Sequence, residues 1–175
     1  LGPFAGLDAP LTANISIGLD RARGVTRFEG DMTLGRGAAD MAGGRFTLEG
    51  GSLRGRYDIA SDELILDQLE LAGDRTRIEG EVRVRDVSAI MRAAPDAPAA
   101  FNITLPSMRM AVPAAFAEPV AFSNVQVVGA IEAAGRTIRL TRLSAHTGDG
   151  QLEASGRVYW AEAGSERRLY PGVEL

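Results

Sequence analysis

Apolar and polar residues alternate with a period of two along most of the chain. Ile15 and Ile17 share one side of such a row, Phe28 and Met32 share one side of the next, and Val82 belongs to a later row. The other side of these rows is polar, and between residues 75 and 85 it carries six charged residues. This alternation predicts half-buried antiparallel strands, roughly ten in number.

In four of the rows the apolar residues change once, in the middle, from even to odd positions or the reverse; we call this a parity slip. In "ELILDQLELAG" (residues 63–73) the slip falls between Leu66 and Leu69, and in "TIRLTRLSAHTG" (residues 137–148) it falls between Leu140 and Leu143. One extra residue in a strand, a β-bulge, restores the facing and bends the strand, and repeated bulges curl a sheet. The bends are predicted at Asp67–Gln68, Thr141–Arg142, Pro106–Ser107 and Ser123–Asn124.

Only one segment is typical of a helix. "DVSAIMRAAP" offers Asp86 as an N-cap, apolar residues at helical spacing over residues 87–94, and Pro95 as a stop. A single short helix cannot cover the apolar sides of all the strands. We therefore expect an all-β fold, an antiparallel, bulged and curled sheet that forms an open apolar groove, with a β-sandwich as the alternative.

The groove has a predicted lining. It consists of apolar residues on the common side of the rows, and glycines such as Gly30 and Gly80 in the same rows leave room inside or relieve strain at a bend. The predicted lining residues are Ile15, Ile17, Phe28, Met32, Leu66, Leu69, Val82, Leu140 and Val158.

Composition and motifs argue against an enzyme. The formal net charge of −4 disfavours nucleic acid as a partner, and the absence of Lys and Cys excludes a Schiff-base lysine and a thiol nucleophile. The single histidine, His146, is expected to be an exposed turn residue, and the cluster Asp58, Asp62 and Glu63 fits a hairpin turn better than a metal site. We expect no catalytic residue, no metal and no cofactor. No apolar run of about 18 residues is present, so no membrane-spanning helix is expected.

The chain also contains a loose internal repeat. Residues 54–84 align with residues 128–160, which matches Gly55 with Gly129 and Gly80 with Gly156. Residues 1–175 are therefore interpreted as one β-groove domain or a slice of a longer repeat protein. The edge near residues 11–19 is expected to receive upstream repeats by strand addition, whereas the tail "SERRLYPGVEL" is expected to stop the repeat.

The segment "LRGRYDIASDELILDQLELAGDRTRIEGEVR" (residues 53–83) resembles the repeats of bacterial AsmA-like proteins. The resemblance implies a repeating β-groove that binds phospholipid acyl chains. It further implies phospholipid transport between inner and outer membranes, in the periplasm, within an inner-membrane-anchored protein. Burial of hydrocarbon at about 0.8 kcal/mol per CH₂ suits such a ligand. The alternative function is a structural or protein-interaction β-sandwich module of an envelope assembly protein.

Overall fold

A single antiparallel sheet forms almost the whole described protein. The structure is a computed structural model, and it describes residues 7–22, 24–41, 44–74, 76–92, 97–110, 118–132, 137–148, 150–163 and 168–174. The strands are β1 (Leu7–Asp8), β2 (Leu11–Asp20), β3 (Gly24–Leu34), β4 (Gly37–Met41), β5 (Gly44–Asp58), β6 (Glu63–Gly73), β7 (Arg77–Arg85), β8 (Ala99–Met110), β9 (Val120–Glu132), β10 (Thr137–Thr147), β11 (Gly150–Ala163) and β12 (Arg168–Glu174). The one helix among the described residues is α1 (Val87–Met91). The all-β prediction is confirmed, and because every described strand joins one sheet, the β-sandwich alternative is wrong.

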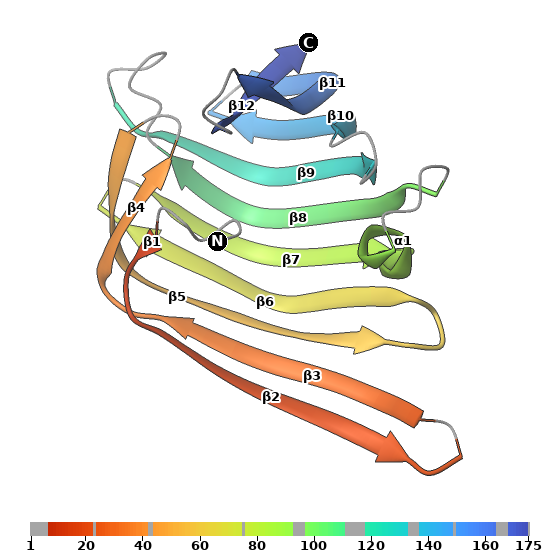
Figure 1. The fold of residues 1–175 in the computed structure, drawn as a ribbon. Coiled ribbons are helices and arrows are strands. Elements are labelled where there is room, and N and C mark those ends of the chain that lie inside the picture. Colours follow the sequence, from red (N-terminus) through yellow and green to blue (C-terminus); the bar gives the residue numbers. More distant parts are fainter. Residues whose placement is uncertain are drawn as a thin grey trace.

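The strands follow one another across the sheet in chain order. From β5 to β12 each strand pairs with the next, so the sheet is a meander (Figure 1). On the other side of β5, β4 pairs with its first half and β3 with its second half, while β1 pairs with β4 and β2 with β3. The chain therefore runs through β1–β2 and through β3–β4 as two bent strands. The described sheet is open, with β2 near one margin and β12 at the other.

The predicted bulges are present and bend the strands. The pairing of β6 with β7 shifts between Leu66 and Leu69, and the pairing of β10 with β11 shifts between Leu140 and Leu143. In β8 and β9 the two slips lie opposite each other and cancel, so that their mutual register stays regular. Asn124 takes up the local turn of the backbone with φ of 50°, a left-handed conformation that asparagine tolerates. The bends predicted from the parity slips are confirmed.

A cluster of buried apolar residues lies along this line of bends. Leu105, Val125 and Ala145 come from three neighbouring strands and form one cluster, in which Val125 is 2% exposed. The half-buried side chains packed against them come from the strands on either side of each bulge: Leu69, Ile78, Ile103, Met108, Phe122, Val127 and Leu143. The core therefore holds the two arms of each bent strand together.

The helix starts where it was predicted but is capped differently. Asp86 precedes α1 in a left-handed conformation (φ 58°) and its side chain makes no capping hydrogen bond. The cap comes instead from Asp62 in the β5–β6 turn, whose carboxylate accepts the Ser88 backbone N–H at 3.0 Å. The helix ends at Met91, earlier than expected, and residues 93–96 lie outside the described part.

The tail of the chain forms a strand, against the expectation that it would stop the sheet. Residues 168–174 make β12, which pairs with β11 from Arg157 to Ala163. Pro171 sits inside this strand opposite Trp160. Proline lacks a backbone N–H and is tolerated in a strand at the edge of a sheet, which is where β12 lies. Pro171 therefore marks an edge strand of the sheet and not the end of strand pairing.

Candidate functional site

The sheet has one apolar face that runs across nearly all of its strands. Residues directly opposite each other in antiparallel strands have their side chains on the same face. One row of successive partners runs Ile15, Gly30, Gly55, Leu66, Val82, Ile103, Val127, Leu143 and Ala154. The next row runs Ile17, Phe28, Tyr57, Leu64, Val84, Phe101, Gly129, Leu140 and Gly156. We call the surface formed by these two rows and their apolar neighbours the apolar face.

Eight of the nine predicted lining residues lie on the apolar face. Ile15, Leu66 and Val82 belong to the first row. Ile17, Phe28 and Leu140 belong to the second. Met32 and Leu69 face each other across Leu53 in a parallel third row. Val158 lies in β11 opposite Ile138, and its side chain is outside the described part of the structure.

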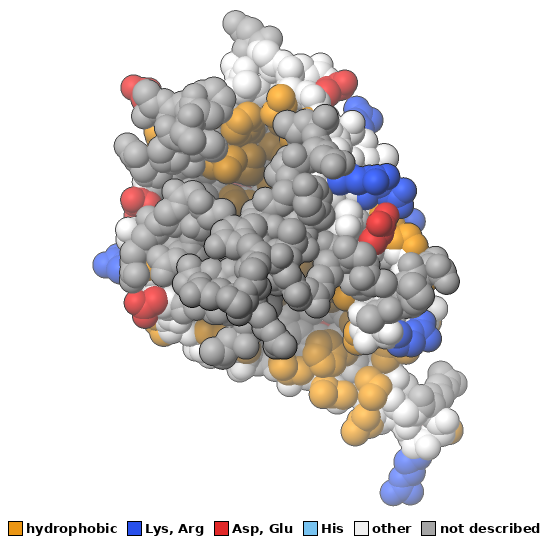
Figure 2. Space-filling view, turned by 45° about the horizontal axis from the view of Figure 1, so that its top comes forward, with side chains coloured by type: hydrophobic (Ala, Val, Ile, Leu, Met, Phe, Trp, Pro, Cys, Tyr) orange, Lys and Arg blue, Asp and Glu red, His pale blue; other side chains and the backbone are white. Residues whose placement is uncertain are grey.

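The apolar face is open at its β2 end. Ile15 is 64% exposed and Ile17 is 54% exposed, and Leu11, Val25 and Phe28 are exposed as well. Toward the bends the same rows become half-buried, as at Leu66 and Val82. Figure 2 shows apolar side chains in the upper and in the lower part of the view, with charged side chains mostly along its margins. Contiguous exposed apolar surface of this kind is uncommon on monomeric soluble proteins unless it binds something.

Two glycines of the apolar face make room for side chains of neighbouring strands. A Cβ on Gly80 would collide with the backbone oxygen of Thr104 and lie 2.5 Å from the Leu105 side chain, which occupies the place over the glycine. At Gly129 the ring of Phe101 takes the same position. At both positions a large side chain from the neighbouring strand therefore occupies the space beside the glycine. Sequence reasoning had noted room at these glycines but not which side chains fill it.

An apolar pocket lies at the α1 end of the apolar face. It has a volume of about 500 Å³ and an almost wholly apolar lining from two hairpins and the helix. The lining residues are Val25, Phe28, Tyr57, Ile59, Leu64, Val87 and Met91. Ligand pockets commonly have volumes of about 300–1,000 Å³ and this type of lining. Ile59 and Met91 were missed in the sequence analysis because they lie in a turn and at a helix end, beyond the strand alternation.

A polar network holds the wall of this end pocket. The Tyr57 hydroxyl donates to Asp62 at 2.6 Å, and the Ser88 hydroxyl donates to the other oxygen of the same carboxylate at 2.7 Å. Arg92 in turn donates to the Ser88 hydroxyl at 2.6 Å. The hydrogen bonds from Tyr57 and Ser88 hold the pKa of Asp62 below its ordinary value, and the bond to Asp62 raises the pKa of Tyr57. The network therefore joins the β5–β6 hairpin to α1 and fixes the pocket.

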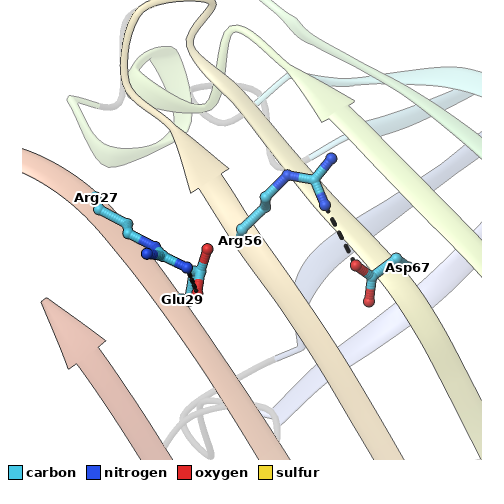
Figure 3. Close-up of polar contacts among 4 residues, drawn as sticks. All are labelled: Arg27, Glu29, Arg56 and Asp67. Atoms are coloured by element: carbon cyan, nitrogen blue, oxygen red, sulfur yellow. Dashed lines mark hydrogen bonds and ion pairs between the residues drawn. The ribbon is translucent and has the colours of Figure 1, made fainter. Parts of the chain in front are cut away.

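The charged residues lie on the other face of the sheet, which we call the outer face. Arg27 and Glu29 pair at 2.6 Å along β3, and Arg56 of β5 pairs with Asp67 of β6 at 3.3 Å (Figure 3). Arg77 pairs with Glu79 at 2.8 Å along its own strand, β7. Exposed pairs of this kind contribute about 0–1 kcal/mol each. These arginines therefore have acidic partners on the face opposite the apolar lining.

The remaining chemical candidates are structural. His146 is exposed in β10 on the outer face, between Ser123 and Gln151, and not in a turn. Asp58 accepts the backbone N–H groups of Ala60 and Ser61 at 2.9 and 3.3 Å, which confirms the expected hairpin turn. Among the residues that the structure describes, no group of three or more acidic or histidine side chains is placed to hold a metal ion.

The fold and the site define an open, single-sheet β protein with one apolar and one charged face. The chain belongs to a bacterial family described as "Uncharacterized protein conserved in bacteria (DUF2125)", which it matches over residues 5–165. No curated protein and no solved structure matches the chain. Within the described residues, no helix is both long and apolar enough to cross a membrane.

The resemblance to AsmA-like proteins is therefore wrong as a family assignment. The features that suggested it were a glycine-containing strand, a parity slip and an "EGEVR" strand end. In the structure two of these features have a local cause, because glycine makes room for a neighbouring side chain and the slip is a bulge. Any bulged meander with one apolar face would show similar features, so they do not identify a family.

Proposed function

We propose that the apolar face binds the acyl chain of a lipid. The observation that carries the proposal is the open apolar face itself, which is continuous across the strands, exposed at Ile15 and Ile17, and leads to the pocket at α1. Transferring hydrocarbon from water to such a surface is favourable by about 0.8 kcal/mol per CH₂. A long-chain ligand would cover the exposed residues without needing a specific polar contact.

The proposal covers binding and not transport. Phospholipid movement between membranes and a periplasmic location were expected from the AsmA-like resemblance, and they lose their support with that resemblance. Two smaller apolar hollows, of about 170 and 150 Å³, lie along β2, β3, β5 and β6, the first beside the end pocket and the second beyond the bulge of β6. Together with the end pocket they favour an extended apolar chain over a compact ligand.

The test uses two neighbouring residues of one strand. Ile17 lies on the apolar face and Ser16, opposite Glu29, lies on the outer face. Ile17→Glu places a charge where the acyl chain would lie, and Ser16→Glu adds the same charge to the same strand on the opposite face. Binding of a long-chain fluorescent fatty acid should weaken by about tenfold or more in Ile17→Glu, since an unpaired charge is costly in apolar surroundings. Ser16→Glu should bind like the unchanged protein.

Native mass spectrometry of protein purified without detergent gives a second measurement. We expect bound lipid in the unchanged protein and in Ser16→Glu, and its loss from Ile17→Glu. Circular dichroism verifies that both variants keep the strand content of the parent. Equal binding by the two variants, or no binding by the unchanged protein, would refute the proposed function.

A further inference from the structure

Strand β2 is an unprotected edge. In the described part of the chain it pairs only with β3, and all of its residues except Gly18 are exposed. Its sequence, "LTANISIGLD", has a single charge, at Asp20, and no proline. Natural edge strands are usually protected by charges, prolines, bulges or a covering segment, because free backbone N–H and C=O groups pair with other strands. Between Leu11 and Leu19 the main interruption is one register shift at Gly18.

The opposite margin of the sheet differs in this respect. Strand β12 carries Pro171 near its middle and has Arg168 and Glu174 at its two ends. Proline removes a backbone donor, and end charges disfavour the close approach of a second strand. A contact in which β2 of one molecule adds to β12 of the next is therefore disfavoured. This leaves β2 pairing with β2 as the contact between copies that the edges allow.

The sequence of β2 is complementary to itself in one antiparallel register. Pro10 bounds the pairable stretch at one end and Asp20 at the other, so its midpoint is Ile15. With Ile15 opposite Ile15 of a second copy, Leu11 meets Leu19 and Ala13 meets Ile17. On the outer face Asn14 then meets Ser16, and Thr12 meets Gly18, which has no side chain to clash with it. A register centred on Asn14 would place Asp8 opposite Asp20, and like charges opposite each other are unfavourable.

We propose that two copies of this chain associate through antiparallel pairing of their β2 strands, centred on Ile15. The twofold axis then stands perpendicular to the sheet, so the two sheets join into one and the two apolar faces lie on the same side. Each copy satisfies the free backbone groups of the other, and the exposed side chains of Leu11, Ile15 and Leu19 gain neighbours. The apolar face itself stays uncovered. The inference therefore does not depend on the proposed binding of lipid.

Single cysteines can test the register, since the chain has no cysteine of its own. Residues directly opposite in antiparallel strands have Cα atoms about 4.5–5.5 Å apart, within the range that a disulfide spans. Ile15→Cys should therefore form a covalent dimer under mild oxidation. Asn14→Cys or Ser16→Cys alone should not, because diagonal neighbours are about 7–8 Å apart. A mixture of Asn14→Cys and Ser16→Cys should cross-link.

The mixed pair also separates edge pairing from stacking of two apolar faces. Asn14 and Ser16 are on the outer face, so molecules stacked by their apolar faces would keep these cysteines apart. Light scattering coupled to size-exclusion chromatography, over a concentration series of the unchanged protein, should show a monomer–dimer equilibrium. A monomer at all concentrations, or dimers in which neither Ile15→Cys nor the mixed pair cross-links, would overturn the proposal.

Discussion

At the scale of single residues, Asp62 connects elements that the chain separates. It sits in the β5–β6 turn with a left-handed backbone (φ 53°) and accepts hydrogen bonds from Tyr57 and from the side chain and backbone of Ser88. Hydrogen bonds to a carboxylate favour its charged form. One side chain thus closes the hairpin, caps α1 and supports the end pocket.

The pKa of Asp62 predicts how stability depends on pH. The pKa in the folded protein lies below the ordinary value of 3.8, chiefly because of the hydrogen bond from Tyr57. The stabilisation is therefore present above pH 3.8 and is lost as pH falls through the folded-state pKa. Asp62→Asn should lower the free energy of unfolding at pH 7, and the difference from the unchanged protein should shrink below pH 3.8. Urea titrations across this range measure it, and Tyr57→Phe should reproduce part of both effects.

Two glycines of the apolar face should respond differently to a methyl group. Gly80→Ala places a Cβ against the Thr104 carbonyl and the Leu105 side chain, so we expect a loss of about 1–3 kcal/mol in the free energy of unfolding. Gly30→Ala meets its nearest atom, the Asn14 carbonyl oxygen, at 3.3 Å. Its effect should be smaller than about 1 kcal/mol, since alanine also restricts the unfolded chain. Equal urea midpoints for the two variants would contradict this account of Gly80.

At the scale of elements, the bulges determine which side chains share a face. If β6 ran through Asp67 and Gln68 as a regular strand with no bulge, its second half would turn its leucines to the outer face. The bulge also bends β6, and Leu69, which follows the bulge, packs against the buried cluster that contains Leu105 and Val125. Facing and bending are thus produced by the same inserted residue.

Deleting Asp67 should therefore be far more harmful than altering its charge. The deletion leaves Leu66 and Leu69 on one face of a regular strand but removes the bulge and the bend that β6 shares with its neighbours, so we expect a clearly lower free energy of unfolding. Asp67→Asn keeps the bulge and weakens only the exposed pair with Arg56, which should cost at most about 1 kcal/mol. Thermal denaturation followed by circular dichroism compares the two variants. A deletion variant that unfolds like Asp67→Asn would show that the bulge is dispensable.

The alternation of side chains made strands, bulges and their common face predictable. The odd spacing between Leu66 and Leu69 is visible in the sequence, because successive side chains of a strand point to opposite faces. Asp62 as the cap of α1 was not predictable, because its partner Ser88 lies 26 residues further along the chain. The strand at Arg168–Glu174 was missed because Pro171 excludes a central strand but not an edge strand, and edges are defined only by the whole sheet.

The sequence also left the topology of the first strands and the end pocket undefined. β1 and β2 form one bent strand, with Pro10 at the bend. β5 pairs with β4 over its first half and with β3 over its second half. Such a division depends on tertiary packing and leaves no period in the sequence. The end pocket combines Val25, Tyr57 and Met91 from separate elements. Only the folded sheet brings these residues together.

At the scale of the whole molecule, apolar and charged residues are segregated by the sheet. Ion pairs such as Arg56–Asp67 lie on the outer face, and the proposed ligand surface lies on the other. Acyl-chain binding should therefore be nearly independent of salt. Raising the salt concentration from about 0.1 to about 1 M shortens the Debye length from about 10 to about 3 Å. Fatty-acid titrations at both concentrations should agree within about twofold, whereas a tenfold weakening would indicate capture of a charged headgroup instead.

The arrangement of strands in chain order has a consequence for how the protein opens. Each strand from β6 to β11 contacts its two sequence neighbours and little else, as in repeat proteins, whose stability is a sum of local and nearest-neighbour terms. Such a molecule can fray from its margins while its middle stays folded. Amide hydrogen exchange should then be slowest in β8 and β9, next to the buried Leu105 and Val125, and should quicken stepwise toward β2 and β12.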